Sequence, residues 1–185
     1  MTTMVETLYG PVEQSTYLIA KQIKLLICDV DGVFSDGLVY MGNDGEELKT
    51  FHTRDGYGVK SLMNADIEVA IITGRNSKIV ENRMRALGIS LVYQGQDDKV
   101  KAYLDICRQL NIDPQHTGYI GDDLIDWPVM EKVALRVCVA DGHPLLRQRA
   151  NYVTHIPGGR GAVREVCDLI LQARGELDVH KGLSI

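Results

Sequence analysis

The sequence predicts a doubly wound α/β fold of three layers, in which helices cover both faces of a mostly parallel sheet. Two observations support this fold. Short apolar runs recur at regular intervals along the chain, and the segments between them carry helical periodicity. Because parallel strands need long crossover connections, usually helices, such alternation favours a doubly wound, Rossmann-like sheet.

The apolar runs are the predicted strands. They are short, rich in β-branched residues and bounded by glycine, aspartate or asparagine, as strands often are. The first is preceded by a polar opening in which we expect a short helix around residues 12–20. The five predicted strands span residues 23–28, 68–72, 91–93, 117–120 and 135–139.

Two of the predicted helices have recognisable ends. One spans residues 78–87 and stops at Gly88, a residue that readily adopts the left-handed conformation of a helix C-terminus. The other spans residues 98–110 and ends before the Asp113-Pro114 break. Both helices follow predicted strands, so they serve as the crossovers that the parallel sheet requires.

One segment departs from the alternation of strand and helix. Residues 38–41 and 47–51 flank Gly42-Asn43-Asp44-Gly45, which is a strong turn signal. We therefore expect a β-hairpin to project between the first strand and its helix.

Composition narrows the class of protein. The chain has 185 residues, of which 45% are hydrophobic and 24% charged, as in ordinary globular proteins. We expect one domain over residues 1–185, with a flexible tail from 175 to 185. The net charge of −5 argues against a nucleic-acid partner, and no apolar run is long enough to span a membrane. Four dispersed cysteines and no targeting segment favour the reducing cytoplasm.

Polar residues gather where the predicted strands end. In an open α/β sheet, ligands bind beyond the carboxyl ends of the strands, so these residues are the candidates for chemistry. The first strand runs into Asp29-Val30-Asp31-Gly32, and the second into Thr73-Gly74-Arg75. Lys99 follows the third strand, and Gly121-Asp122-Asp123 ends the fourth, with Asp126 close behind.

This set of motifs resembles the haloacid dehalogenase superfamily over about residues 24–139. The resemblance implies that Asp29 is a nucleophile and that Asp31 donates and then accepts a proton. It also implies that Thr73 and Lys99 bind the phosphoryl group. A hard cation would lower the repulsion between a carboxylate and a phosphate dianion. Mg²⁺ is the natural choice, and Asp29 and Asp122 would supply its carboxylate ligands. The resemblance implies that the backbone carbonyl of Asp31 is a further ligand.

Each assignment has a simpler alternative. Asp29 could be a turn residue at a strand end, Thr73 could cap the following helix, and Lys99 could be a solvated helix lysine. Asp123 and Asp126 suit a supporting role better than direct ligation, because three carboxylates would over-neutralise one Mg²⁺.

The intervals between the motifs leave no room for a cap domain, so a neighbouring subunit is the expected cover of the site. The hairpin and the loop at residues 51–58 resemble the capless, tetrameric 3-deoxy-D-manno-octulosonate 8-phosphate phosphatases, which serve lipopolysaccharide biosynthesis. An anionic sugar-acid phosphate needs cationic and polar partners. Besides Asp31 and Lys99, the predicted substrate contacts are His52, Thr53, Arg54, Asp55, Gly56, Lys60, Arg75 and Arg83.

Two other functions stay open at this point. The chain could hydrolyse another eight- or nine-carbon sugar-acid phosphate, because the motifs do not distinguish chain length or hydroxyl stereochemistry. It could also be a noncatalytic oligomerisation module. The second alternative is disfavoured because a binding module would not need Asp29, Asp31, Thr73, Lys99 and Asp122 together.

Overall fold

The computed structural model describes residues 3–177. Its centre is a sheet of six parallel strands in the order β10-β9-β8-β3-β6-β7, which confirms the predicted doubly wound α/β fold. The strands span Leu25–Cys28 (β3), Glu68–Ile72 (β6), Leu91–Tyr93 (β7), Thr117–Gly121 (β8), Leu135–Cys138 (β9) and Tyr152–Val153 (β10). Five lie where the sequence places them, whereas the two-residue β10 was not predicted.

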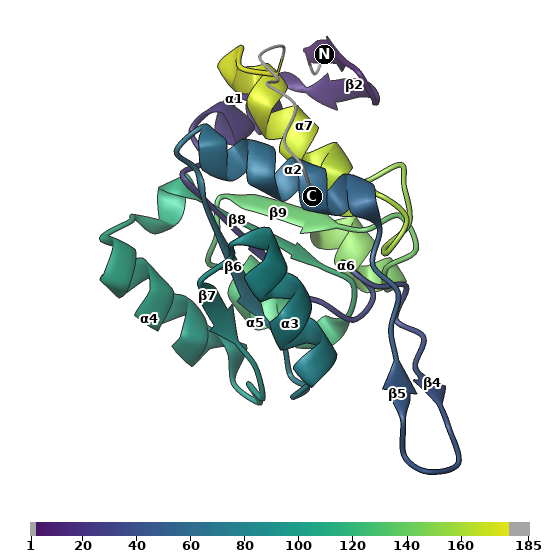
Figure 1. The fold of residues 1–185 in the computed structure, drawn as a ribbon. Helices are drawn as coiled ribbons and strands as arrows, with labels where there is room; N and C mark the ends of the chain where they lie inside the picture. Colours follow the sequence, from purple (N-terminus) through teal and green to yellow (C-terminus); the bar gives the residue numbers. More distant parts are fainter. Residues whose placement is uncertain (1–2, 178–185) are drawn as a thin grey trace.

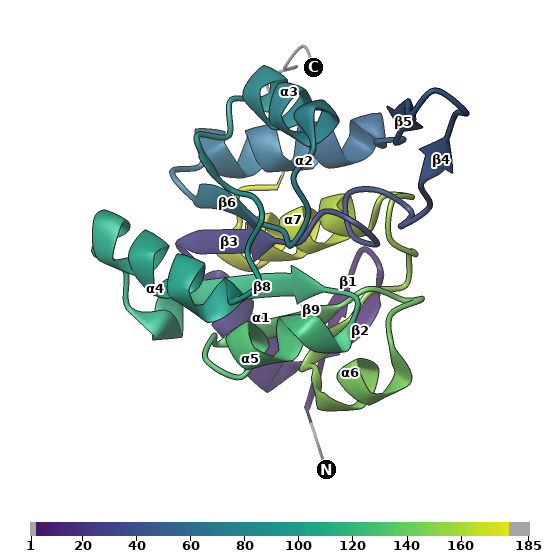
Figure 2. The same cartoon turned by 90° about the horizontal axis from the view of Figure 1, so that it is seen from below.

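Helices cover both faces of the sheet, as Figures 1 and 2 show. Strand β3 is fully buried, and its side chains alternate between two apolar clusters. Leu26 and Cys28 belong to the apolar cluster on one face of the sheet, which four helices cover. Leu25 and Ile27 belong to the cluster on the other face, which three helices cover. The first group is α1 (Gln14–Lys21), α2 (Thr53–Asn64), α3 (Lys78–Leu87) and α7 (Ala162–Arg174). The second group is α4 (Lys99–Leu110), α5 (Trp127–Met130) and α6 (Pro144–Arg149).

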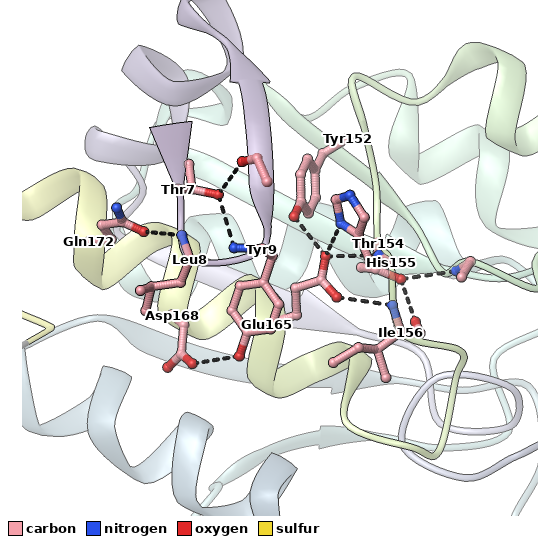
Figure 3. Close-up of polar contacts among 12 residues, drawn as sticks. Thr7, Leu8, Tyr9, Tyr152, Thr154, His155, Ile156, Glu165, Asp168 and Gln172 are labelled. Atoms are coloured by element: carbon pink, nitrogen blue, oxygen red, sulfur yellow. Dashed lines mark hydrogen bonds and ion pairs between the residues drawn. The ribbon is translucent and has the colours of Figure 1, made fainter. Parts of the chain in front are cut away.

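An N-terminal hairpin was not predicted. Strands β1 (Met4–Thr7) and β2 (Gly10–Glu13) pair antiparallel before α1, which begins at Gln14 rather than near residue 12. Side chains of α7 hold the turn between the two strands (Figure 3). The Tyr9 hydroxyl donates to Asp168 at 2.8 Å, and the Leu8 amide donates to the Gln172 side chain at 3.2 Å. Most of the predicted flexible tail, residues 178–185, lies outside the described residues.

The predicted second hairpin is present but short. Its strands are β4 (Tyr40–Met41) and β5 (Glu47–Leu48), and it extends away from the sheet (Figures 1 and 2). Four of its apolar side chains are exposed, namely Leu38, Tyr40, Met41 and Leu48. Phe51 instead packs against the core. The hairpin therefore presents an apolar surface outside the body of the molecule.

A buried carboxylate fixes the loop that precedes α7. Glu165 Oε1 accepts hydrogen bonds from the Tyr152 hydroxyl at 2.7 Å and the His155 amide at 2.8 Å, and Oε2 accepts from the Ile156 amide at 3.0 Å (Figure 3). These bonds satisfy a charge that would otherwise be costly to bury. They also hold the glycine-rich segment 158–161, which packs on the candidate active site.

Candidate active site

The sheet register brings the predicted catalytic residues to one edge. Cys28 at the end of β3 pairs with Ile71 of β6 and Ile120 of β8. Asp29, Thr73 and Asp122 therefore follow three neighbouring strands at their carboxyl ends. The chain order also reverses at β3, since β6 lies on one side and β8 on the other. Ligands of open α/β sheets bind at such a switch point.

Asp29 is almost completely buried, with 6% of its surface exposed. Its Oδ1 accepts a hydrogen bond from the Val30 amide at 2.7 Å, and its Oδ2 lies 2.7 Å from Lys99 Nζ. Burial and the nearby Asp126 carboxylate raise the pKa of Asp29 to about 7, against the opposing effect of Lys99. Asp29 is thus held by its neighbours at the carboxyl edge of the sheet and is not a solvated turn residue.

Lys99 begins α4 and is buried, so the alternative of a solvated surface lysine is wrong. Its Nζ lies 2.7 Å from both Asp29 and Asp126, and 3.3 Å from the Tyr119 hydroxyl. Desolvation lowers its pKa, but the two carboxylates outweigh that effect and the net shift is upward. A charged ammonium therefore lies beside the candidate nucleophile.

Asp126 supports the other groups. Its Oδ1 accepts from Tyr119 and Lys99, and its Oδ2 accepts from the amides of Asp122 and Asp123 at 2.9 and 3.2 Å. Asp126 is fully buried, and both of its oxygens are already used. Asp123 is exposed and accepts a hydrogen bond from the Leu124 amide. This arrangement fits the supporting role that the sequence suggests for both residues.

The donor set fits a hard divalent cation. Asp29, Asp122 and Asp126 each offer a carboxylate oxygen, and these oxygens lie within 4.8 Å of one another. Burial and the carboxylates of Asp126 and Asp29 raise the pKa of Asp122 to about 8. Such crowding of like charges is relieved by a cation. Because Asp126 is saturated by hydrogen bonds, Asp29 and Asp122 are the better ligands.

Glycines allow close packing of the catalytic loop, which is the loop after β3 that carries Asp29 and Asp31. Gly32 has φ of +88°, and a Cβ there would lie 2.1 Å from Asp122 Oδ2. Gly158, in the segment before α7, packs against Gly32. A Cβ at Gly158 would lie 1.7 Å from the Gly32 carbonyl oxygen. The Gly159 amide donates to the Val33 carbonyl at 2.8 Å. The segment 158–161 therefore supports the loop that carries Asp29 and Asp31.

Thr73 and Asp31 complete the predicted catalytic set. Thr73 is buried, and its backbone bonds to Tyr93 and Gln96. It does not cap the following helix, because Ser77 occupies the N-cap position of α3. Asp31 is more exposed, and its Oδ1 forms an ion pair of 2.5 Å with Lys49 Nζ.

The other predicted substrate residues lie on α2, on α3 and in the segment that follows β6. His52 caps α2 by accepting a hydrogen bond from the Arg54 amide at 3.1 Å, and Thr53 and Arg54 are exposed in the first turn. Arg75 is exposed beyond β6 and lies 3.0 Å from Glu47. Lys60 on α2 and Arg83 on α3 are partly buried.

Asp55 and Gly56 are buried in the first turns of α2, and their contact with substrate stays a prediction. Asp55 Oδ1 accepts a hydrogen bond from the Arg164 amide at 2.8 Å, which joins α2 to α7. Desolvation raises the pKa of Asp55 to about 7. A Cβ at Gly56 would lie 2.7 Å from Arg83 Nη2. Both residues therefore position α2 against its neighbours.

Three polar residues near the site were missed from the sequence. Tyr119 lies inside β8, where its hydroxyl bonds to Asp126 and Lys99. Glu47 and Lys49 lie at the base of the hairpin. Because side chains alternate between the two faces of a strand, Glu47 and Lys49 lie on the face opposite Leu48. That alternation could have identified them as residues near the site.

Comparison with known proteins places the chain in a family. A model of haloacid dehalogenase-like hydrolases matches residues 89–157. The chain is 62% identical over 179 residues to the 3-deoxy-D-manno-octulosonate 8-phosphate phosphatase KdsC of Escherichia coli, covering 97% of this chain and 95% of the relative. It belongs to the 3-deoxy-D-manno-octulosonate 8-phosphate phosphatase family.

Two solved structures of this phosphatase family share the fold. The crystal structure from Yersinia pestis superposes with a TM-score of 0.98 at 59% identity, over the full length of both chains. The structure from Moraxella catarrhalis contains magnesium, phosphate and the octulosonate sugar. It superposes with a TM-score of 0.86 at 44% identity, covering 88% of this chain and 94% of that one.

Among the described residues, no helix has both the length and the apolar character needed to cross a bilayer.

Proposed function

We propose that this chain hydrolyses 3-deoxy-D-manno-octulosonate 8-phosphate to the free sugar acid and phosphate, in lipopolysaccharide biosynthesis. The observation that carries the proposal is the buried contact of Asp29 with Lys99 beside Asp122, in a chain that shares 62% identity with the E. coli phosphatase. A nucleophile, a fixed cation and a metal-binding carboxylate are the parts that phosphoryl transfer to aspartate requires.

In the first half of the reaction, a carboxylate oxygen of Asp29 attacks phosphorus. The bond between phosphorus and the sugar oxygen breaks, and Asp31 gives its proton to the leaving alkoxide. Lys99 stabilises negative charge on Asp29 and on the phosphoryl oxygens, at a position that Asp126 and Tyr119 fix. The products of this half are the free sugar acid and an aspartyl-phosphate.

In the second half, Asp31 takes a proton from water and the resulting hydroxide attacks the same phosphorus. The bond to Asp29 breaks, which releases phosphate and restores the carboxylate. The hydroxyl of Thr73, which follows β6 beside the end of β3, would donate a hydrogen bond to a phosphoryl oxygen. Asp31 thus acts as acid and then as base, and returns to its protonated state after each turnover.

Asp29, Asp122 and the backbone carbonyl of Asp31 would hold the Mg²⁺ ion. When bound, this ion offsets the repulsion between the attacking carboxylate and the phosphate dianion. Arg54, Arg75 and Arg83, together with Lys60, are the proposed partners of the sugar-acid end of the substrate, because a carboxylate is best bound by charged hydrogen-bond donors.

Substrate and metal are tested together. With Mg²⁺ present, kcat/KM should be highest for the eight-carbon substrate in a panel that includes nine-carbon sugar-acid phosphates. Excess chelator should lower turnover by at least about 100-fold, and Ca²⁺ should restore it poorly, because Ca²⁺ prefers a larger and more flexible shell. A nine-carbon preference would favour the alternative substrate. Full activity in chelator would exclude the metal assignment.

We also propose a cytoplasmic homotetramer in which residues 1–185 act as one domain. The exposed apolar side chains of the second hairpin support assembly, because an isolated two-stranded ribbon is marginally stable in water. A neighbouring subunit would then cover a site over which residues 3–177 form no cap domain. The four free cysteines agree with a reducing compartment.

The hairpin can be tested by placing charge on it. Tyr40 and Leu48 lie opposite each other in the β4–β5 register and are 51% and 67% exposed. Replacing both with aspartate should dissociate the oligomer in light scattering, because unpaired charge is costly in a desolvated contact. Turnover of the sugar phosphate should fall more than turnover of 4-nitrophenyl phosphate.

The matched control for this double variant is Leu104→Asp, since Leu104 is an exposed leucine on α4. A double variant that keeps the native mass, or that loses both activities equally, would contradict a role of the hairpin as the cover.

A further inference from the structure

Four charged side chains of alternating sign link the base of the second hairpin to the catalytic loop. Arg75 Nη2 lies 3.0 Å from Glu47 Oε2. The other oxygen of Glu47 lies 3.6 Å from Lys49 Nζ, which in turn lies 2.5 Å from Asp31 Oδ1. We propose that Lys49 and Glu47 are positioning residues that hold the carboxyl group of Asp31 in the orientation needed for proton transfer. The proposal rests on the proposed phosphatase function.

Burial distinguishes this arrangement from an ordinary surface ion pair. The side chain of Lys49 is 0% exposed, whereas Glu47 and Asp31 are 28% and 22% exposed. A buried ammonium is stable only with carboxylate partners, so Lys49 has little freedom to leave Asp31. Glu47 Oε1 is itself buried without a hydrogen bond, and its charge faces the same ammonium. The two carboxylates therefore fix Lys49 from both sides.

The contact uses one oxygen of Asp31 and leaves the other available. Oδ1 receives the Lys49 ammonium, and Oδ2 makes no hydrogen bond within the described part of the chain. The two oxygens therefore have different partners: Oδ1 is held by Lys49, and Oδ2 is left for proton transfer. Oδ2 then gives its proton to the leaving alkoxide and regains one from water. Lys49 fixes which oxygen performs these transfers.

The same arrangement joins the acid to the hairpin and to Arg75. Glu47 and Leu48 form β5 and Lys49 follows it, so Leu48 faces outward while the residues on either side of it face Asp31. A hairpin that is displaced would move Lys49 and thereby Asp31. Arg75, a proposed substrate contact, is oriented by the same glutamate. The hairpin is thus a structural support of the catalytic acid as well as an exposed surface.

The test compares Lys49→Met with Lys49→Arg on two substrates. Methionine keeps the length of the side chain but removes the charge. With the sugar phosphate, kcat should fall about 10- to 100-fold in Lys49→Met, because a misplaced general acid is a poor catalyst. Lys49→Arg should recover most of this loss. KM should change little, because the proposed effect of Lys49 acts through Asp31.

4-Nitrophenyl phosphate separates positioning from general damage. Nitrophenolate leaves without help from an acid, so phosphorylation of Asp29 should stay fast, whereas hydrolysis of the phosphoenzyme still needs Asp31. Lys49→Met should therefore show a burst approaching one nitrophenolate per site, followed by slow turnover. Lys101→Met is the matched control, because Lys101 is 83% exposed and forms a surface ion pair with Asp98.

An unchanged kcat in Lys49→Met, or a loss on both substrates without a burst, would overturn the inference. If Lys49→Met fails to fold, Glu47→Gln decides the matter: a burst with this variant supports the inference, and its absence overturns it. The wild-type protein tests the proposed function separately. A wild type inactive on every sugar-acid phosphate would overturn that function, whereas an active wild type with a normal Lys49→Met would overturn only the positioning role.

Discussion

Replacing Asp29 with asparagine is expected to lower turnover of the sugar phosphate by at least about 10⁴-fold while leaving the fold intact. The amide is nearly isosteric with the carboxylate, and its oxygen can still accept the hydrogen bond from the Val30 amide. It cannot attack phosphorus. Steady-state kinetics with Mg²⁺ would measure the loss, and thermal unfolding would show that the variant is folded.

The control for this change is Asp66→Asn. Asp66 is exposed in the turn after α2, and its φ of +58° is one that asparagine tolerates well. The control should retain full activity. Turnover above a thousandth of the wild-type rate in Asp29→Asn, with intact mass excluding deamidation, would refute the assignment of the nucleophile.

The second large effect is expected for Lys99→Met. Without the ammonium, the phosphoryl group loses its fixed cation, and kcat should fall by about 10²- to 10³-fold. Asp29 and Asp126 also lose the charge buried between them, which should reduce the free energy of unfolding at pH 8 by about 3 kcal/mol. Phosphatase kinetics and urea unfolding of metal-free protein would measure the two effects.

The stability loss in Lys99→Met should depend on pH. The folded-state pKa of Asp29 is about 7, above its ordinary value of 3.8. Such a group stabilises the fold fully only below about pH 4, and this contribution is lost as pH rises through 7. Because Lys99 opposes the upward shift of the Asp29 pKa, its removal should cost less at pH 5, where Asp29 is protonated, than at pH 8. Lys101→Met is the control, and a pH-independent loss would contradict the electrostatic explanation.

Much of the fold could be predicted because local patterns determine it. The bounds of β6, β7 and α3 agree with their apolar runs and with Gly88. The catalytic residues could be predicted because parallel strands place their carboxyl ends together, so neighbours of strand ends meet in space whatever their separation in sequence.

The remaining features depend on contacts between distant segments. The hairpin of β1 and β2 lacks a strong alternating pattern and is held by Asp168 and Gln172 of α7. Asp55 is buried because α2 packs on α7, and a short sequence window does not contain that information. Lys49 likewise resembles a surface lysine until the fold places Asp31 beside it.

The close packing of Gly158 on Gly32 has a consequence for protein engineering. The loop that carries Asp29 and Asp31 is supported from behind by backbone atoms of a segment more than a hundred residues later in the chain. Transplanting residues 29–36 onto another parallel sheet would therefore transfer the reactive groups without the support that fixes their conformation. A functional transplant needs two noncontiguous pieces, and the second contributes glycine backbone rather than any reactive side chain.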